Sequence, residues 1–458
     1  KKIICLVCYI INIIIFIISF KLLDKMNKIL EYKKEFFLLI ILYLSLYLSF
    51  FFESRDAIEN LENEFFGAFL QRIGPYSDFI MREKIIENFN NNFLYTLRNY
   101  DETTDRHSPL ILVYFSIYRK FGLDIDTIRL LHLNILPFCS YAFFKCLRVK
   151  FPNVKRSLLF LLSLILFLSP PMRALSIWPD SRIYGLLFFI ISIYFYIKFI
   201  NHKNFLDALY NTFFLCLASY ISPNFAVFFI FYFYNFFTYY KFSIKIFVIL
   251  FINIICSLPA YYYLFTMKVF FLSTPAVGGV DFLARINVSN KILIISSIIL
   301  FYFIPFLMNR DLVSQYFRNN IIYKKILASS ILTIIFIYFF SYEVSFTGGG
   351  IFFQLSNMIF DNNILFFIIC FLSIFLFISL WNIDFNNKLI LICLIISTPQ
   401  LTIYHKYFDP LLIVLFLLSF NLNFNFKKII NFDFIKRLYF FYFTFLILNY
   451  LKYLYVFL

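Results

Sequence analysis

The chain has 458 residues, of which 62% are hydrophobic and 14% charged, and its mean hydropathy is +0.83. Soluble domains carry about 25% charged residues, so this composition excludes an ordinary soluble domain. The net charge of +16 would suit nucleic acid, but no basic stretch with interleaved aromatic residues lies outside the apolar segments. We therefore predict an all-α polytopic membrane protein, which partners the lipid bilayer and not nucleic acid.

Residues 1–35 form a separate N-terminal part. Residues 3–20 are an apolar run, which no small-residue cleavage site of a secretory signal follows. Lysines then mark residues 21–35 as a basic cytoplasmic linker. Met26 opens a stretch that reads like an ordinary start of a membrane protein. Residues 1–25 are thus either an extra segment or an upstream extension of the reading frame, and the sequence leaves both open.

Residues 36–458 are expected to form the transmembrane domain. A helix needs about 20 apolar residues to cross the hydrocarbon core of a bilayer. On this basis we predict thirteen spans, to which residues 3–20 would add one more. The predicted spans are 36–52, 126–144, 157–170, 183–198, 206–221, 224–238, 246–262, 291–307, 326–341, 364–380, 388–399, 410–421 and 438–457.

Positive charge indicates the orientation of these spans. With residues 21–35 inside, most Lys and Arg residues fall in inner loops, as is usual for cytoplasmic loops. The short outer loops after residue 168 hold only Arg173, Arg182, Lys268, Arg285, Lys291 and Lys406. The large first loop, residues 53–125, is therefore outside. We expect a bacterial inner membrane with this loop in the periplasm, or the endoplasmic reticulum membrane with the loop in the lumen if the source is eukaryotic.

The first outer loop contains helical patterns. In FFESRDAIENLENEFF, residues 51–66, most carboxylates and the asparagines share one face of a helical wheel, and apolar side chains occupy the opposite face. The polar face holds Glu53, Asp56, Glu59, Asn60, Asn63 and Glu64, and the apolar face holds Ile58, Leu61, Phe65 and Phe69. Such a helix lies flat on the membrane, with its carboxylates toward water or a cavity. Residues 108–121 are too short to span and are also expected at the interface.

Polar residues on the predicted outer side form five clusters. Ionisable groups near the bilayer are costly and tend to be functional. Because all five lie on one side, an enzyme is favoured over an alternating-access carrier, which needs polar groups at mid-membrane. The clusters are residues 53–56, 100–110, 169–182, 341–357 and 403–410.

This layout resembles the GT-C superfamily of polyprenyl-phosphate-sugar-dependent glycosyltransferases, especially aminoarabinose transferases and protein O-mannosyltransferases. Thirteen spans is also the count in the aminoarabinose branch. One departure is that Glu53 and Asp56 replace an adjacent Asp-Glu pair. The motifs that carry the resemblance are His107 to Leu110 (HSPL), Thr127 to Leu130 (TIRL) before the second span, Asp180 and Arg182 in WPDSR, and Lys406, Tyr407 and Pro410 in the last outer loop.

The resemblance implies transfer of a sugar from a lipid-linked donor to a lipid, polysaccharide or protein acceptor at the outer face. The attack needs a carboxylate that takes the acceptor proton, for which we predict Asp56, with Glu53 as the alternative. The rival interpretation is that these carboxylates merely solvate an amphipathic helix. The leaving phosphate needs fixed polar or positive groups. The candidates are Lys406, Tyr407, Arg182, Arg173, Arg106 and His405.

Four more carboxylates are candidates for positioning the acceptor: Asp101, Glu102, Asp105 and Asp180. The first three could instead bind a divalent cation through hard oxygen ligands, or belong to a solvated loop with a helix cap. Asp180 could equally form a structural ion pair with Arg182. The triglycine Gly348 to Gly350 is either an anion-binding nest or a flexible loop. No residues are spaced as metal ligands, so the metal and any cofactor stay open.

Two other function classes fit a polytopic chain with a large outer loop. The first is an O-antigen polymerase or ligase, whose large loop usually comes later and depends on Arg and His. The second is a flippase or other transporter of lipid-linked sugars, which predicts polar spans and an internal repeat. The early, acid-rich loop and the lack of a clear repeat favour the transferase.

Overall fold

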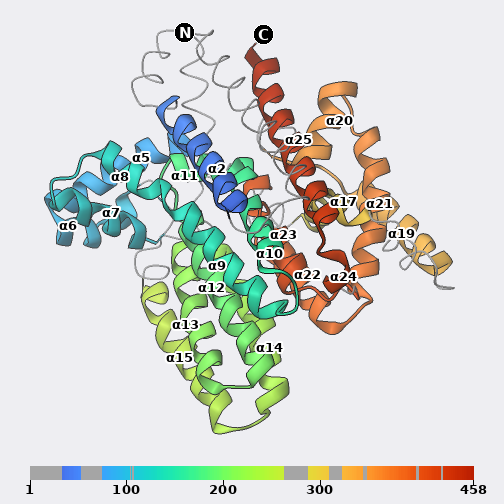
Figure 1. Ribbon diagram of the computed structural model, residues 1–458, viewed down its shortest axis with the longest axis horizontal. Helices are drawn as coiled ribbons and strands as arrows, with labels where there is room; N and C mark the ends of the chain where they lie inside the picture. The colour runs from blue at the N-terminus through green and yellow to red at the C-terminus, as the bar shows by residue number, and fades with distance from the viewer. Residues whose placement is uncertain are drawn as a thin grey trace. The chain divides into compact units, whose positions relative to one another are not determined.

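The computed structural model describes residues 33–52, 75–103, 105, 108–262, 287–308, 322–343, 348–398, 402–423 and 426–457. Across these ranges the regular structure is helical, without a strand, and an isolated bridge joins Gly348 to Tyr404 (Figure 1). The predicted all-α class is therefore confirmed. The chain divides into two compact units, unit 1 (residues 1–105, 109–190 and 425–458) and unit 2 (residues 106–108 and 191–424).

Unit 1 contains the helices around the first outer loop. Of these, α5, α6, α7 and α8 lie together in Figure 1. The helices of this unit are α2 (Lys33–Phe52), α5 (Pro75–Asn91), α6 (Phe93–Arg98), η1 (Tyr100–Glu102), α7 (Leu110–Lys120), α8 (Ile125–Leu133), α9 (Ile135–Lys150), α10 (Arg156–Ser163), η2 (Leu164–Leu168), α11 (Pro170–Ile177), the start of α12 (Ser181–His202), α24 (Phe426–Ile429) and α25 (Phe432–Phe457).

Unit 2 is built from apolar helices in two groups. The first group packs α13, α14 and α15 together, and the second packs α17, α19, α20 and α21 together. After the end of α12, its helices are α13 (Phe205–Ile221), η3 (Pro223–Phe228), α14 (Phe229–Tyr240), α15 (Ile244–Tyr261), α17 (Val288–Leu307), α19 (Ile322–Tyr338), α20 (Gly350–Phe360), α21 (Ile364–Trp381), α22 (Phe385–Ile396), η5 (His405–Tyr407) and α23 (Leu411–Leu418).

Each of the thirteen predicted spans coincides with helical structure, but the helices differ in length. Among the residues that the structure describes, five segments are long and apolar enough to cross a membrane: Ile125–Lys150, Ser181–His202, Ile244–Tyr261, Val288–Leu307 and Ile364–Trp381. Arg156–Leu168 and Pro170–Ile177, which meet at 67°, would together form a sixth. Others are much shorter, and the 8 residues of α23 rise only about 12 Å. The count of thirteen spans stays a prediction.

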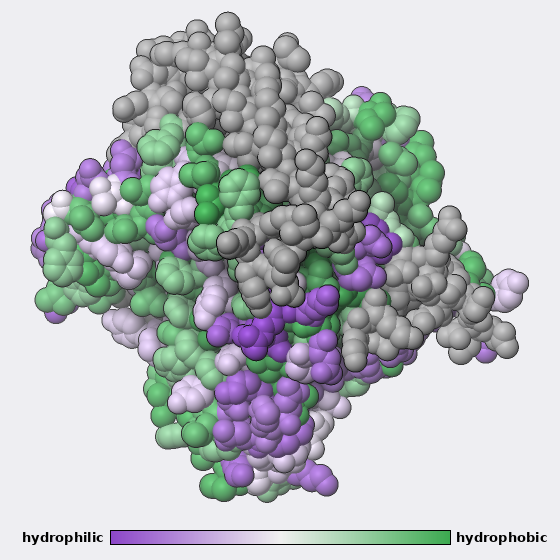
Figure 2. Space-filling view, viewed as in Figure 1, coloured by the Kyte–Doolittle hydropathy of each residue, from purple (hydrophilic) through white to green (hydrophobic). Residues whose placement is uncertain are grey.

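The exposed face of α15 shows why these helices fit a membrane. Phe247, Phe251, Ile254 and Leu258 are each about half exposed or more. Figure 2 shows hydrophobic side chains along the outer edge of α13 and α15. A continuous apolar face of this kind is unfavourable in water and is favourable against lipid. The apolar composition of the chain and the exposed side chains of α15 both indicate a helix that faces lipid.

The segment predicted to form the large first outer loop is more helical than the sequence suggests. The helix predicted at 108–121 is present as α7, and its position at the membrane interface stays a prediction, whereas α5 and α6 were not predicted. They were missed because residues 75–98 are rich in charges and asparagines and contain no long apolar run. The expected helix beginning at residue 53 lies outside the described residues, as does the N-terminal segment 1–32.

Candidate functional site

Arg82 is the centre of a buried ion network in unit 1. Its Nε lies 3.0 Å from Oδ2 of Asp105, and its Nη1 lies 3.2 Å from Oδ2 of Asp180. The Arg182 Nη1 approaches the same Asp180 oxygen at 3.9 Å. The side chains of these four residues are at most 11% exposed. The network joins Asp105 of the second predicted cluster to Asp180 and Arg182 of the third.

The amphipathic character of α5 explains how Arg82 reaches this position. Phe79, Arg82, Ile86 and Phe89 follow one another at helical spacing, and all four are buried. Arg82 is thus the polar member of an otherwise apolar stripe. Buried charges are stable only when they are paired, and the two arginines here balance two aspartates. This apolar stripe is the signal by which the sequence could have revealed Arg82.

Asp180 has a local role as well as a long-range one. Its Oδ1 accepts a hydrogen bond of 2.8 Å from the backbone N–H of Arg182, in the first turn of α12. A carboxylate at a helix N-terminus is favoured by the helix dipole. The ion pair with Arg182, which was one of the two interpretations of WPDSR, is present, although the shorter contact is with Arg82.

Arg129, from the TIRL motif, is buried against aromatic rings. Its guanidinium carbon lies 3.6 Å from the ring centroid of Trp178 and 5.0 Å from that of Phe50. Its Nη1 also pairs with Oδ1 of Asp126 at 3.0 Å. A desolvated cation–π contact of this kind contributes about 2 kcal/mol. Because Trp178 precedes Asp180 by two residues, the same short loop contacts both buried arginine sites.

Arg173 occupies a third buried position, at the bend between η2 and α11. Pro170 and Pro171 open α11, where backbone N–H groups have no acceptor within the helix, so proline is tolerated there. The Arg173 Nη1 donates to the carbonyl of Phe167 in η2 at 3.3 Å, and its Nη2 donates to Ser45 and Ser49 of α2 at 2.9–3.0 Å. The described contacts of this predicted phosphate ligand therefore close the bend and fasten α11 to α2.

In unit 2 the structure brings the fourth and fifth predicted clusters together. The backbone N–H of Gly349 donates to the carbonyl of Ile403 at 3.1 Å, next to the bridge between Gly348 and Tyr404. Oη of Tyr302 and Nε2 of His405 lie 2.6 Å apart. Lys406 Nζ lies 5.1 Å from the ring centroid of Tyr404, and the Tyr407 ring lies 6.1 Å from that of Tyr404. Tyr302, in α17, was not among the predicted site residues.

The triglycine has a packing role that neither sequence interpretation included. Gly349 and Gly350 have φ values of +85° and +78°, and the Gly349 N–H is bonded within the protein. A Cβ on Gly350 would lie 2.9 Å from Cγ1 of Ile298. Glycine is thus required here both by the backbone conformation and by the close approach of α17.

We expect Gly350→Ala to destabilise unit 2 by more than the ~1–2 kcal/mol of a left-handed alanine alone, because the methyl group also overlaps Ile298. The matched control is Gly122→Ala, where φ is +79° but nothing lies within 4 Å of an added Cβ. Thermal unfolding of both variants in the same detergent measures the difference. Equal losses at the two positions would contradict the packing role.

The remaining predicted residues are not in these clusters or are not described. Asp101 and Glu102 lie in η1 and are exposed. They are not part of the ion network to which Asp105 and Asp180 belong. Asp56, Glu53 and Arg106 lie outside the described residues. Among the described residues, no group of three or more His, Cys, Asp or Glu side chains could hold a metal ion. A divalent cation stays a prediction.

Comparisons of this chain with protein-family models, with curated proteins and with solved structures find no match.

Proposed function

We propose that this chain is a GT-C-type glycosyltransferase, which moves a sugar from a polyprenyl-phosphate donor to an acceptor at the outer face of the membrane. The observation that carries the proposal is the buried network of Arg82, Asp105, Asp180 and Arg182. Only 14% of the residues in this chain are charged, yet four ionisable side chains are buried together in this network. Such groups are expensive to bury and concentrate at functional sites.

In the proposed reaction, an acceptor hydroxyl or amine attacks the anomeric carbon of the donor sugar. The bond between that carbon and the phosphate oxygen breaks, and the phosphate leaves with the electron pair. Asp56, or Glu53 in its place, takes the acceptor proton. Arg182, with Arg106, His405, Lys406 and Tyr407 from the other outer segments, stabilises the departing phosphate. The thirteen spans and the outer position of the first loop are part of this proposal.

The supporting geometry is divided between the two units. In unit 1, Asp105 and Asp180 hold Arg82 and Arg182 at one place, where the first outer loop meets the second. Asp105 and Asp180 then act as positioning residues, because they orient the arginines. In unit 2, the fixed edge at Ile403 holds the segment that carries His405 and Lys406.

The test is a turnover assay on the full chain in lipid nanodiscs. Polyprenyl phosphates that carry mannose, glucose or aminoarabinose are supplied with an extract of envelope lipids and glycans, and free polyprenyl phosphate is measured. We expect one donor to be cleaved only when the extract is present. If the chain is placed in sealed lipid vesicles, passage of intact donors across the bilayer without cleavage would instead show a transporter. Release of polyprenyl diphosphate from a diphosphate-linked oligosaccharide would show a polymerase or ligase.

A further inference from the structure

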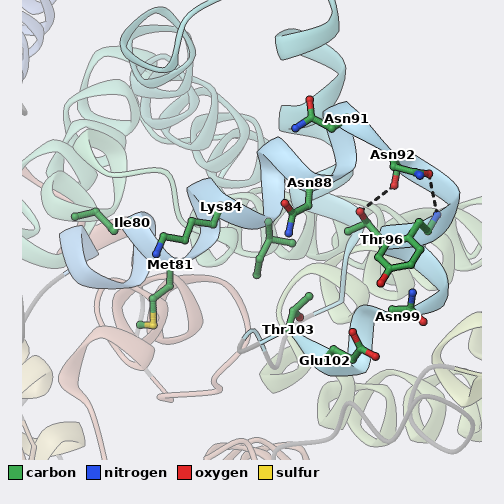
Figure 3. A pocket seen from close by; sticks show the side chains of 12 residues that line it. Ile80, Met81, Lys84, Asn88, Asn91, Asn92, Thr96, Asn99, Glu102 and Thr103 are labelled. Atoms are coloured by element: carbon green, nitrogen blue, oxygen red, sulfur yellow. Dashed lines mark hydrogen bonds between the residues drawn. The ribbon is translucent and has the colours of Figure 1, made fainter.

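A pocket lined by asparagines and apolar side chains lies along α5. The cavity has a volume of about 520 Å³, and Figure 3 shows α5 on one side and α6 with the following turn on the other. Four asparagines line it: Asn88, Asn91, Asn92 and Asn99. Pockets of roughly 300–1,000 Å³ are typical of small-molecule sites. The pocket is therefore large enough for one or two sugar rings.

The asparagine amides are available to a ligand. Those of Asn88, Asn91 and Asn99 make no protein hydrogen bond in the part of the chain that the structure describes. The Asn92 Oδ1 accepts a hydrogen bond of 3.2 Å from the backbone N–H of Tyr95, and the NH₂ group of Asn92 is left to donate to a ligand. Each amide offers two donors and one acceptor. This matches hydroxyl groups, which donate and accept at the same oxygen.

The charges of the pocket point to a neutral ligand. One cation, Lys84, and one anion, Glu102, line it, so it has no net charge. A phosphate or a carboxylate would meet as much repulsion as attraction. The Tyr95 side chain, 60% exposed, offers an aromatic face and a hydroxyl, and Met81 adds an apolar edge. Aromatic side chains of this kind combine an apolar body with a polar end.

We propose that this pocket binds a neutral carbohydrate, and that the carbohydrate is part of the acceptor. The second half of this inference rests on the proposed glycosyltransferase function. It is favoured by the position of the pocket on α5, because the buried stripe of the same helix holds Arg82. Glu102 and Thr103 also line the pocket immediately before Asp105 in the chain. A glycan in the pocket would thus lie beside the segment that carries the ion network.

The experiment measures saccharide binding directly. The full chain in nanodiscs is titrated with maltotriose, cellotriose, mannotriose and chitotriose, and saturation-transfer NMR reports the bound sugar protons. Trialanine and inorganic phosphate are the non-carbohydrate probes. We expect saturable binding of at least one trisaccharide and about tenfold weaker binding in Asn88→Leu, since losing hydrogen bonds worth about 1.4 kcal/mol costs a factor of ten. The matched control, Asn90→Leu on the same helix but outside the pocket, should bind like the parent.

The outcomes separate the pocket from the proposed reaction. Saccharide binding that Asn88→Leu weakens, without donor cleavage, would support the pocket and refute the transferase. Donor cleavage with unchanged saccharide binding and unchanged KM for acceptor in Asn88→Leu would refute the pocket alone. Binding of none of the trisaccharides, or stronger binding of trialanine or phosphate, would also overturn it. Asn91→Leu provides a second variant if Asn88→Leu fails to fold.

Discussion

Replacing Arg82 by methionine is expected to destabilise unit 1 by about 3–5 kcal/mol, as is usual when one partner of a buried ion pair is removed. The side chains of Asp105 and Asp180 would lose the guanidinium that now lies 3.0 and 3.2 Å away. Methionine keeps much of the volume and the helix propensity of arginine, so the loss reports on charge. Thermal unfolding of the full chain in detergent, followed by circular dichroism, is the measurement.

Two further variants test this expectation. Arg182→Met should cost less than Arg82→Met, because its contact with Asp180 is longer, at 3.9 Å. The double variant Arg82→Met, Asp105→Asn should recover much of the lost stability, since Asp105 is then uncharged and Asp180 keeps Arg182 as its partner. An Arg82→Met protein as stable as its parent would mean that the network is dispensable for folding.

The second large effect is expected from Asp56→Asn, which should lower turnover by ~10²–10⁴-fold, the usual contribution of a general base. Asparagine has nearly the same size but cannot take the acceptor proton. Donor binding should therefore stay near that of the parent while turnover falls. Both quantities are measured on nanodisc samples, binding with a labelled polyprenyl-phosphate sugar and turnover by release of polyprenyl phosphate.

The control for Asp56 is Glu59→Gln, which removes another carboxylate from the same predicted helix face. This variant should keep its turnover. Glu53→Gln decides between the two predicted bases, because only the true base shows the full loss. If all three variants lose activity equally, the carboxylates act as a solvated face, and no one of them is the base.

The sequence was sufficient for the apolar helices but not for their lengths, nor for the polar helices α5 and α6. Long apolar runs such as Ser181–His202 and Ile364–Trp381 are predicted correctly because hydropathy reports burial directly. In α23, the apolar run continues through residues that do not continue the helix, which ends at Leu418. Hydropathy records which residues avoid water, and it does not record where backbone hydrogen bonds stop.

The candidate site was predictable only where its contacts are local. The pairing of Asp180 with Arg182 follows from a spacing of two residues, and it is found. The contact between Arg82 and Asp180 joins positions 98 residues apart, which no local pattern contains. The close approach of Gly350 to Ile298 was missed for the same reason, since a glycine run without its packing partner resembles a flexible loop.

The bend before α11 has a consequence for how this segment tolerates change. Proline fits at positions 170 and 171 because the N–H groups of a first helical turn have no acceptor within the helix. Arg173 is different, since one guanidinium donates to the Phe167 carbonyl before the bend and to Ser45 and Ser49 of α2. A change at position 173 would therefore loosen the bend and its attachment to α2 together, whereas a change at position 171 would remove neither contact.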